Sequence, residues 1–455
     1  MALDQVTSWL RERREEHLGW ALEFCRIPSI STLAEHKADM VRAAAWTREL
    51  LERVGLTARI YESPGHPIVY AEHLQADGAP TCLVYGHYDV QPTGDPALWH
   101  SGPFDPQVRD GLLYARGSAD DKGQVLAHIR AAAAWLATER RLPVNLKFLI
   151  EGEEEISSPN LAPFIQQHTD LLRCDGILIS DTGMYQDGWP TITYGTRGLV
   201  YKEIRLFGPK HNLHSGMFGG SLANPANVLA DIIAQLHYSD GRVRIPGFYD
   251  DVVVPSEEER AQLRALPHND KQYAAELGVP KLTGERGFTT NERRWVRPTL
   301  DVNGIYGGFM AEGANTIIPA SAGAKISMRL VPNQSGAKVR ELFESAIRKL
   351  CPQTVRLEIL DHGAADPYMA PLDGRPMQAA RRALKEAFGR DTALIREGGS
   401  LPILPLFKRV LSADSLLIGF AGPNCNAHGP NENVNLADLD RGAEALARTL
   451  SYLAG

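Results

Sequence analysis

The segment Thr81–Gln91, TCLVYGHYDVQ, narrows the possible folds more than any other part of the chain. Its apolar residues predict a buried strand that is interrupted at Gly86 and followed at once by His87 and Asp89. Because side chains two residues apart in an extended segment point the same way, we expect the imidazole and the carboxylate to leave the strand end together. An isolated His-x-Asp is more often a hydrogen-bonded turn than a site, so the other segments must decide.

Short apolar runs alternate with helical segments in the first part of the chain. The predicted strands are Ala58–Tyr61, Ile68–Glu72, Cys82–Tyr85, Leu112–Ala115, Leu146–Ile150 and Gly176–Ser180. The predicted helices are 4–25, 36–54, Gln124–Arg140 and Pro159–Leu172. This alternation predicts an α/β fold with a mixed, mostly parallel sheet flanked by helices. Such sheets bind ligands beyond the carboxyl ends of their strands.

The 455 residues are too many for one compact core, and the pattern changes after about Gly195. The next segments are Leu199–Phe207 (strand), Asn224–His237 (helix), the charged insertion Gly241–Pro298, Ala324–Val331 (strand), Gly336–Leu350 (helix) and Thr354–Leu360 (strand). The α/β pattern then returns with Arg375–Phe388 (helix), Ser415–Phe420 (strand) and Leu436–Leu453 (helix). We therefore predict a discontinuous domain, 1–194 and 372–455, with an α+β domain, 195–371, inserted into it.

Charge and cysteine content exclude several classes of protein. The net charge is −7 and no basic stripe is present, which argues against nucleic acid or a membrane surface as partner. No apolar run approaches the roughly 20 residues of a membrane span, and the N-terminus lacks the apolar region of a signal peptide. The five cysteines are scattered and odd in number, so we expect reduced thiols and a cytoplasmic protein.

Two acidic segments follow predicted strands. In YARGSADDKG, Asp120 and Asp121 precede a helix; capping explains one of them, and two adjacent aspartates exceed what a cap requires. In LIEGEEEISS, within Leu149–Ser158, glutamates crowd the end of a predicted central strand. Such crowding costs repulsion unless a cation compensates it. A bound metal ion explains this charge density better than a solvated turn does.

Two further candidates lie after later apolar strands: Asp181 in ILISDTG and His428 in GPNCNAHGPNEN. Each alone is more often a turn residue than a ligand. Together the segments supply two His, two Asp and one Glu at the same predicted edge of the sheet. Oxygen and imidazole donors without cysteine suit Zn²⁺, Mn²⁺ or Co²⁺. Five donors suffice for two ions about 3.5 to 4 Å apart if one aspartate bridges them.

Six ordered motifs, HYDVQP, GSADDKG, EGEEE, SDTG, HSGMFGG and AHGPNE, together resemble the M20 metallopeptidases, and among them the cytosolic dipeptidase and carnosinase-like branch. The resemblance covers nearly the whole chain. It implies that one metal is held by His87, Asp120 and Asp181, and the other by Asp120, Glu155 and His428. It also implies that Glu154 is the general base and that Asp89 orients His87. The chain departs from the family pattern at Glu153, where an uncharged residue is usual.

The resemblance further implies a role for the inserted domain as a lid and dimerisation domain. Its His214 would reach the neighbouring subunit's site in a homodimer and stabilise the oxyanion. Arg329 would bind the carboxylate of the substrate, since a guanidinium can bind a carboxylate with two hydrogen bonds. The other implied substrate-binding residues are Thr316, Ser400, Asp181 and His428, and His362 is a further candidate for the pocket.

The implied activity is hydrolysis of the peptide bond of dipeptides by a hydroxide that bridges two divalent ions, with a Glu general base. Zn²⁺ is the first expectation for both ions, with Mn²⁺ or Co²⁺ as alternatives. A second hypothesis is an amidohydrolase for N-acyl amino acids, of the acetylornithine or succinyl-diaminopimelate deacylase type. A third is a binding protein that keeps the fold without the chemistry; the complete set of ligands and Glu154 argue against it.

Overall fold

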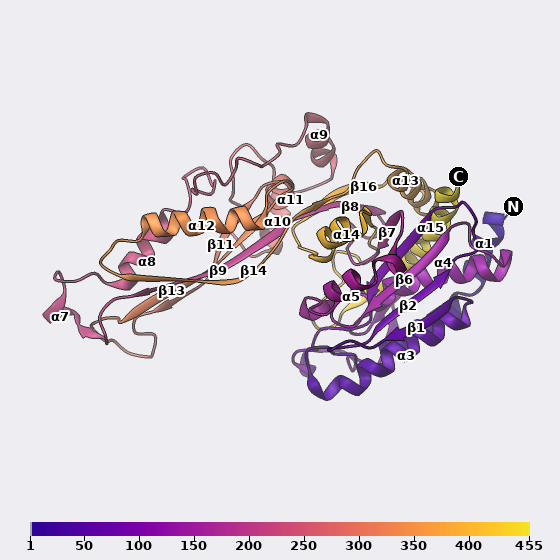
Figure 1. Cartoon of the computed structure of the whole chain (residues 1–455), viewed down its shortest axis with the longest axis horizontal. Coiled ribbons are helices and arrows are strands. Elements are labelled where there is room, and N and C mark those ends of the chain that lie inside the picture. Colours follow the sequence, from indigo (N-terminus) through magenta and orange to yellow (C-terminus); the bar gives the residue numbers. More distant parts are fainter. Residues whose placement is uncertain (1) are drawn as a thin grey trace. The chain divides into compact units, whose positions relative to one another are not determined.

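The computed structural model describes residues 2–455, which form two compact units (Figure 1). Unit 1 comprises the chain up to Tyr194, Ala370–Ile395 and Leu406–Gly455. Unit 2 comprises Gly195–Met369 and Arg396–Pro405. The return of the chain to unit 2 at Arg396 was not predicted from the sequence.

Unit 1 combines a large sheet with helices on both of its faces. Its helices are α1 (Ala2–Glu12), α2 (Arg14–Cys25), α3 (Lys37–Arg53), α4 (Lys122–Glu139), α5 (Leu161–Gln167), α6 (Thr169–Leu172), α13 (Arg375–Phe388), α14 (Ile403–Leu411, which begins in unit 2) and α15 (Leu436–Ala454). Its strands are β1 (Thr57–Tyr61), β2 (Ile68–His73), β3 (Thr81–His87), β4 (Gln107–Arg109), β5 (Leu112–Tyr114), β6 (Asn145–Glu151), β7 (Gly176–Ile179), β17 (Ser415–Leu417) and β18 (Asn433–Asn435). Strands β8 (Thr191–Thr196) and β16 (Ala393–Glu397) run across the boundary between the units.

The strands of the large sheet follow the order β1-β2-β6-β3-β7-β17-β8. The centre is parallel, because β3 pairs in parallel with β6 and β7, and β7 pairs in parallel with β17. Antiparallel strands flank it on both sides, β1 and β2 on one and β8 on the other. The predicted mixed α/β sheet is confirmed, with its parallel part confined to the centre.

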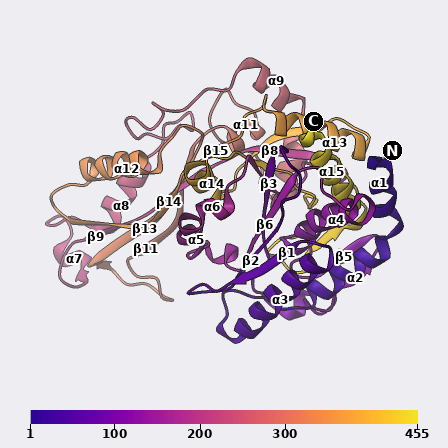
Figure 2. The same cartoon turned by 45° about the vertical axis from the view of Figure 1, so that its right-hand side comes forward.

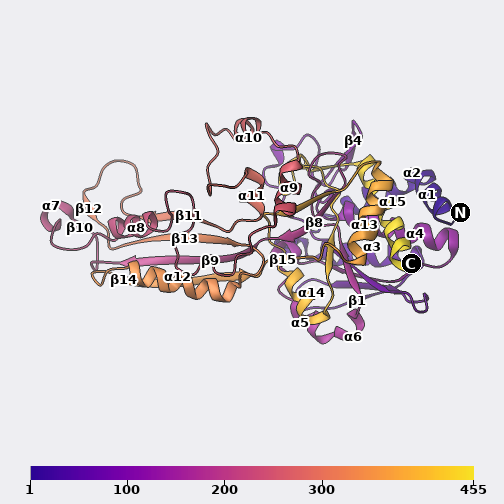
Figure 3. The same ribbon diagram turned by 90° about the horizontal axis from the view of Figure 1, so that it is seen from above.

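Alternation along the central strands builds two buried faces. Val84 and Phe148 belong to the large hydrophobic core that also contains Val125 of α4 and Leu446 of α15. Tyr85 points to the opposite face, where its ring packs edge-on against Phe407 of α14. Figure 2 shows α4 and α15 on one side of the strands and α5 and α6 on the other, and Figure 3 shows α13 beside α15. This burial on both faces explains why the central strands read as continuous apolar runs.

Unit 2 is built on an antiparallel sheet of order β11-β13-β9-β14. Its strands are β9 (Gly198–Phe207), β10 (Leu213–His214), β11 (Thr299–Gly307), β12 (Ile317–Ile318), β13 (Ser321–Leu330), β14 (Arg356–Ala365) and β15 (Tyr368–Met369). Its helices are α7 (Ser215–Phe218), α8 (Pro225–Ala234), α9 (Glu257–Ala265), α10 (Asp270–Glu276), α11 (Thr290–Trp295) and α12 (Gly336–Leu350). Helices α8 and α12 pack on one face of this sheet, where Ile204 and Ile326 meet Leu229 and Phe343.

The structure corrects several predicted elements. The single helix predicted over 4–25 is two helices, α1 and α2, and the one predicted over 159–172 is also two, α5 and α6, with the break at His168. The charged insertion, predicted without elements, contains α9, α10 and α11, whose N-caps are Ser256, Asn269 and Thr289. The breaks were missed because neither Arg13 nor His168 is a glycine or a proline, the residues that most often mark the end of a helix. None of the helices within residues 2–455 is long and apolar enough to cross a membrane.

Candidate metal centre

The candidate ligands of unit 1 lie where strands of the large sheet end. His87 is the last residue of β3, Asp181 follows β7, and Glu155 lies in the short 3-10 turn (Glu154–Ile156) after β6. Asp120 precedes α4, which packs closely against β3 at Gly86. A Cβ added to Gly86 would lie 2.5 Å from Val125 Cγ2, so glycine lets the helix that follows Asp120 approach the strand that carries His87.

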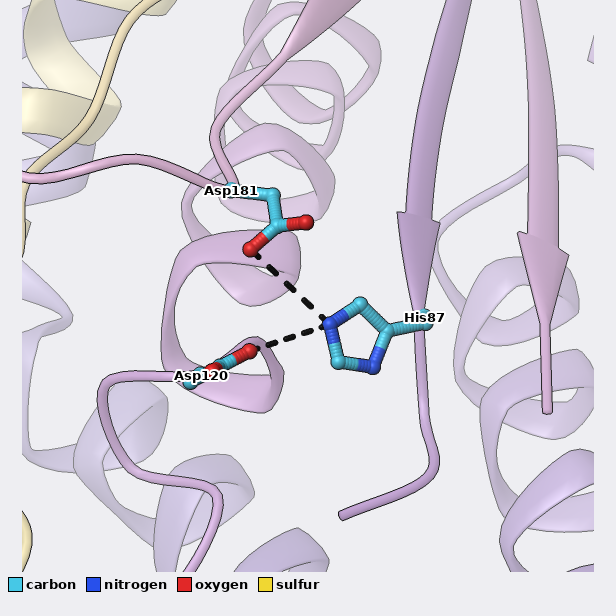
Figure 4. A group of neighbouring side chains, drawn as sticks. All are labelled: His87, Asp120 and Asp181. Carbon is cyan, nitrogen blue, oxygen red and sulfur yellow. Dashed lines mark hydrogen bonds and ion pairs between the residues drawn. The ribbon is translucent and has the colours of Figure 1, made fainter. Parts of the chain in front are cut away.

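The first cluster contains His87, Asp120 and Asp181 (Figure 4). Nε2 of His87 lies 3.1 Å from Oδ1 of Asp120 and 3.9 Å from Oδ1 of Asp181. One donor atom from each residue lies within 4.8 Å of the other two. The His87 side chain is fully buried, whereas the two carboxylates are 19% and 13% exposed. The buried imidazole therefore points at two carboxylates that are partly exposed to solvent.

The second cluster contains Asp120, Glu155 and His428. Nε2 of His428 lies 2.9 Å from Oδ2 of Asp120 and 3.3 Å from Oε2 of Glu155. Asp120 thus turns one oxygen to each histidine, Oδ1 to His87 and Oδ2 to His428. A carboxylate shared in this way is what two neighbouring metal ions require of a bridging ligand.

Asp89 holds both the imidazole of His87 and the glutamate turn. Nδ1 of His87 lies 3.0 Å from the Asp89 carbonyl oxygen and 3.3 Å from Oδ1 of its carboxylate. The same carboxylate accepts hydrogen bonds from the backbone N–H groups of Glu154 (3.2 Å) and Glu155 (3.1 Å). Fixing Nδ1 leaves Nε2 of His87 free to face Asp120, which is how a second residue orients a metal-binding histidine.

Burial and neighbouring groups shift the pKa values of several side chains in this site. Burial, together with the negative charge of Asp181, raises the pKa of Glu154 to about 9. Burial likewise raises the pKa of Asp181 to about 6, against the hydrogen bond from His87. Hydrogen bonds to Asp120 and Glu155 raise the pKa of His428 to about 10. Carboxylates gathered this closely repel one another and thereby favour a bound cation.

Glu153 faces away from both clusters. Its Oε1 accepts hydrogen bonds from the His66 N–H (3.1 Å) and the Asn160 amide (3.0 Å), and its Oε2 accepts from Asn160 as well. The residue is only 4% exposed. These contacts give Glu153 a different role from Glu154 and Glu155. The spacing of the glutamates in the sequence did not distinguish the three.

Three residues that support the site were not predicted: the partly buried Gln91 and the buried Glu151 and Glu432. Nε2 of Gln91 donates a hydrogen bond to Oε2 of Glu155 (2.8 Å). Glu151 accepts from Tyr85 Oη (2.6 Å) and from the Ser158 hydroxyl (2.7 Å). Glu432 accepts hydrogen bonds from the backbone N–H groups of Gly117, Ala119 and Asp120, which precede α4. Gln91 and Glu432 stand inside the motifs HYDVQP and AHGPNE, so their position was a signal, but no pattern indicates which backbone groups they contact.

The remaining predicted site residues lie in unit 2. His214 accepts a hydrogen bond at Nδ1 from the Gly216 N–H (3.1 Å), and its strand β10 pairs with β12, directly after Thr316. Nη1 of Arg329 donates to the Ser400 hydroxyl (2.9 Å). Unit 2 therefore brings His214 close to Thr316, and Arg329 into contact with Ser400.

His362 and Asp121 are held by other contacts. Nε2 of His362 lies 2.9 Å from Oε2 of Glu203, on β9 of unit 2. Asp121 is 1% exposed and belongs to neither cluster of unit 1. Its Oδ2 instead accepts from the His87 N–H at 3.4 Å. Of the two adjacent aspartates, only Asp120 faces the histidines.

Comparison with known proteins agrees with this geometry. The model of "Peptidase family M20/M25/M40" matches residues 83–452. The chain is 30% identical to Beta-Ala-His dipeptidase of Homo sapiens, over 98% of this chain and 91% of that protein. It is 32% identical to Cys-Gly metallodipeptidase DUG1 of Saccharomyces cerevisiae, over 85% of this chain and 82% of that protein.

A solved structure, the M20 family metallo-carboxypeptidase Sso-CP2 from Sulfolobus solfataricus, superposes with a TM-score of 0.84. The two sequences are 33% identical, and the superposition covers 96% of this chain and 99% of the Sso-CP2 chain. The match of the family model spans most of the chain and includes every residue of the two clusters. The resemblance predicted from the motifs is confirmed: the chain belongs to the M20/M25/M40 family of peptidases.

Proposed function

We propose that the chain is a dinuclear metallodipeptidase that hydrolyses the peptide bond of dipeptides. The observation that carries the proposal is Asp120, whose two oxygens face His87 and His428 in adjacent clusters. Family membership confirms the prediction of a metal-dependent hydrolase. Relatives named as dipeptidases, at 30% and 32% identity, favour dipeptides over N-acyl amino acids as substrates.

The donor atoms fit two divalent metal ions. Both clusters offer only carboxylate oxygens and imidazole nitrogens, the donors of Zn²⁺, Mn²⁺ and Co²⁺ sites. His87, Asp120 and Asp181 would hold one ion and Asp120, Glu155 and His428 the other, with Zn²⁺ the first candidate. Bound there, divalent ions supply Lewis acidity toward the scissile carbonyl and lower the pKa of an attacking water.

The residues of unit 1 divide the remaining tasks. Glu154 precedes Glu155 of the second cluster in the chain and belongs to neither cluster. We assign it as the general base, which takes a proton from the attacking water and then gives it to the leaving amine. Asp89 keeps the imidazole of His87 and the turn of Glu154 in place through the contacts described above. No covalent intermediate between chain and substrate is needed.

The residues of unit 2 would recognise the substrate. Arg329, supported by Ser400, would bind the carboxylate of the dipeptide, and His214 with Thr316 would stabilise the oxyanion. Asp181 and His428 would contact the substrate in addition to metal. We further propose a homodimer in which His214 acts on the partner's site, with residues 195–371 as the lid and dimerisation domain. The five cysteines are all free thiols, which favours a cytoplasmic enzyme.

Metal content per chain and a small substrate panel test the proposal. We expect about two divalent ions per chain, loss of activity after chelation, and its return when Zn²⁺, Mn²⁺ or Co²⁺ is added. The panel compares Ala-Ala and Gly-Leu with N-acetyl amino acids. Hydrolysis of the acylated compounds alone would instead establish the amidohydrolase alternative, and a protein without hydrolytic activity would support the binding-protein hypothesis.

A further inference from the structure

Glu432 is a fully buried carboxylate that belongs to neither metal cluster. It follows His428 in the same loop and lies directly before β18. Its Oε1 accepts hydrogen bonds from the backbone N–H groups of Ala119 (2.9 Å) and Asp120 (3.1 Å). Its Oε2 accepts from the Gly117 N–H (3.0 Å) and from Nη1 of Arg116 (2.7 Å). All four contacts lie in the segment that ends at Asp120.

The backbone around Glu432 strengthens this link. The Ala115 N–H donates to the Glu432 carbonyl oxygen (3.1 Å), and β18 pairs with β5 at Asn433 and Tyr114. Arg116, 1% exposed, also donates from Nη2 to the carbonyl oxygen of Pro92 (3.0 Å). The segment that carries Asp120 and the loop that carries His428, far apart in sequence, are therefore joined through both the side chain and the backbone of Glu432.

Hydrogen bonds to a charged acceptor are the strong ones, and a buried donor left without a partner is costly. Glu432 satisfies three backbone donors in the few residues that set the position of Asp120. Because Asp120 faces both His87 and His428, a shift of this backbone would disturb both clusters at once. The loss of Glu432 should therefore affect both clusters, whereas the loss of a ligand such as Glu155 should affect chiefly the cluster to which that ligand belongs.

We propose that Glu432 is a positioning residue that fixes the shared ligand Asp120 relative to both clusters. The inference rests on the proposed dinuclear centre and goes beyond it, because it assigns a role to a residue that touches neither metal nor substrate. The alternative is that the Arg116–Glu432 pair contributes to the stability of unit 1 alone.

The matched control is Glu285 in unit 2. This glutamate is also buried and paired with an arginine, Arg297, through two hydrogen bonds of 2.8 Å each. It contacts no residue of the two clusters. Glu432→Gln and Glu285→Gln therefore make the same chemical change in buried arginine–glutamate pairs, of which only the first touches the Asp120 segment.

The test measures Zn²⁺ affinity of the full chain by competition with a chelator, with circular dichroism to confirm that each variant is folded. In Glu432→Gln the amide N–H₂ cannot accept the backbone hydrogen bonds. We expect the dissociation constants of both ions to rise about 10- to 100-fold. Glu285→Gln should leave both constants unchanged even where its melting temperature falls, and Glu155→Gln should weaken chiefly one ion.

Wild-type affinity for both ions in folded Glu432→Gln would overturn the inference, as would weakening of one ion alone. Should Glu432→Gln fail to fold, Glu432→Asp keeps the charge but cannot span all four donors, and the same rise in both constants is expected of it. Failure of the wild-type chain to bind metal would instead refute the proposed function. The two failures are therefore distinguishable.

Discussion

At the scale of single residues, the site depends on neighbouring glutamates that do different work. Glu153 binds the 63–66 turn, Glu155 faces His428, and Glu154 stands free of both clusters. Backbone geometry in the short turn separates the three side chains, because Asp89 holds the N–H groups of Glu154 and Glu155 in place. One shift in register along this turn would exchange a base for a ligand.

Glu154→Gln should keep both metal ions and lose turnover by about 10²- to 10⁴-fold, the usual contribution of general acid–base catalysis. Glu155→Gln should lose or weaken one ion. Metal content by elemental analysis together with kcat for Gly-Leu distinguishes the variants. The reverse pattern, with metal lost from Glu154→Gln and kept by Glu155→Gln, would show that the base is misplaced.

His17 offers a second prediction at this scale. It is 2% exposed, lies between Trp9 and Trp20, and neither ring nitrogen has a hydrogen-bond partner within the described residues. Burial, with the nearby charges of Arg130 and Arg13, lowers its pKa from 6.5 to about 3. Between these values the unfolded chain binds a proton that the folded chain does not, so stability falls as pH decreases.

From about pH 7 to about pH 5, His17 should therefore cost the wild-type chain about 2 kcal/mol in free energy of unfolding. His17→Phe, which keeps an aromatic ring without a titratable nitrogen, should lack this part of the decrease. Urea denaturation of metal-free protein at both pH values measures the difference between the two chains. An equal decrease in both would mean that His17 binds its proton as readily in the folded chain as in the unfolded one.

At the scale of elements, the glutamate turn is attached to the sheet and to the 63–66 turn by buried carboxylates. Glu151, at the end of β6, binds Ser158 across the turn, and Glu153 binds Asn160 and the backbone of His66. Irregular segments keep a fixed shape only when their polar groups find such partners. Hydrogen bonds at several points thus fix the loop that carries Glu154 and Glu155 relative to β6 and the 63–66 turn.

Glu153→Ala should leave the His66 N–H and the Asn160 side chain without their acceptor and loosen the turn. We expect kcat to fall by about tenfold and the ion of the second cluster to bind more weakly, as when an outer partner of a ligand is removed. Steady-state kinetics and chelator competition measure both effects. Glu49→Ala on α3, whose side chain is 60% exposed, is the control; an equal effect there would exclude a specific role for Glu153.

At the scale of the whole molecule, the candidate residues are divided between two units. The two clusters belong to unit 1, whereas His214, Thr316, Arg329 and Ser400 belong to unit 2. The proposed function therefore assigns metal binding to unit 1 and substrate binding to unit 2. In the proposed homodimer, the His214 that acts on one site would come from the partner chain.

His214→Ala should lower kcat by about 10² to 10³, the effect of removing one oxyanion donor. Mixing it with Glu154→Gln, which is inactive for a different reason, should restore part of the activity, because one hybrid site would contain both an intact base and an intact His214. Activity measured against mixing ratio tests this. Without any recovery, and with subunit exchange shown by a tagged chain, His214 would act within its own subunit.

Local sequence determined much of this protein. Apolar runs predicted the central strands, and the helices predicted over Gly336–Leu350 and Arg375–Phe388 match α12 and α13. Donor residues after strand ends predicted a metal site at one edge of the sheet, which the resemblance to the M20 family divided into the two clusters. These features are local because burial and strand ends leave direct traces in residue order. The polar strand β8, the breaks between paired helices and the return of Arg396–Pro405 to unit 2 left no such trace. Only the tertiary structure showed that Glu153 binds Asn160 and the backbone of His66, and that Glu432 is joined to the Asp120 segment. The reason is that hydrogen bonds between residues far apart in sequence depend on how the chain folds back on itself.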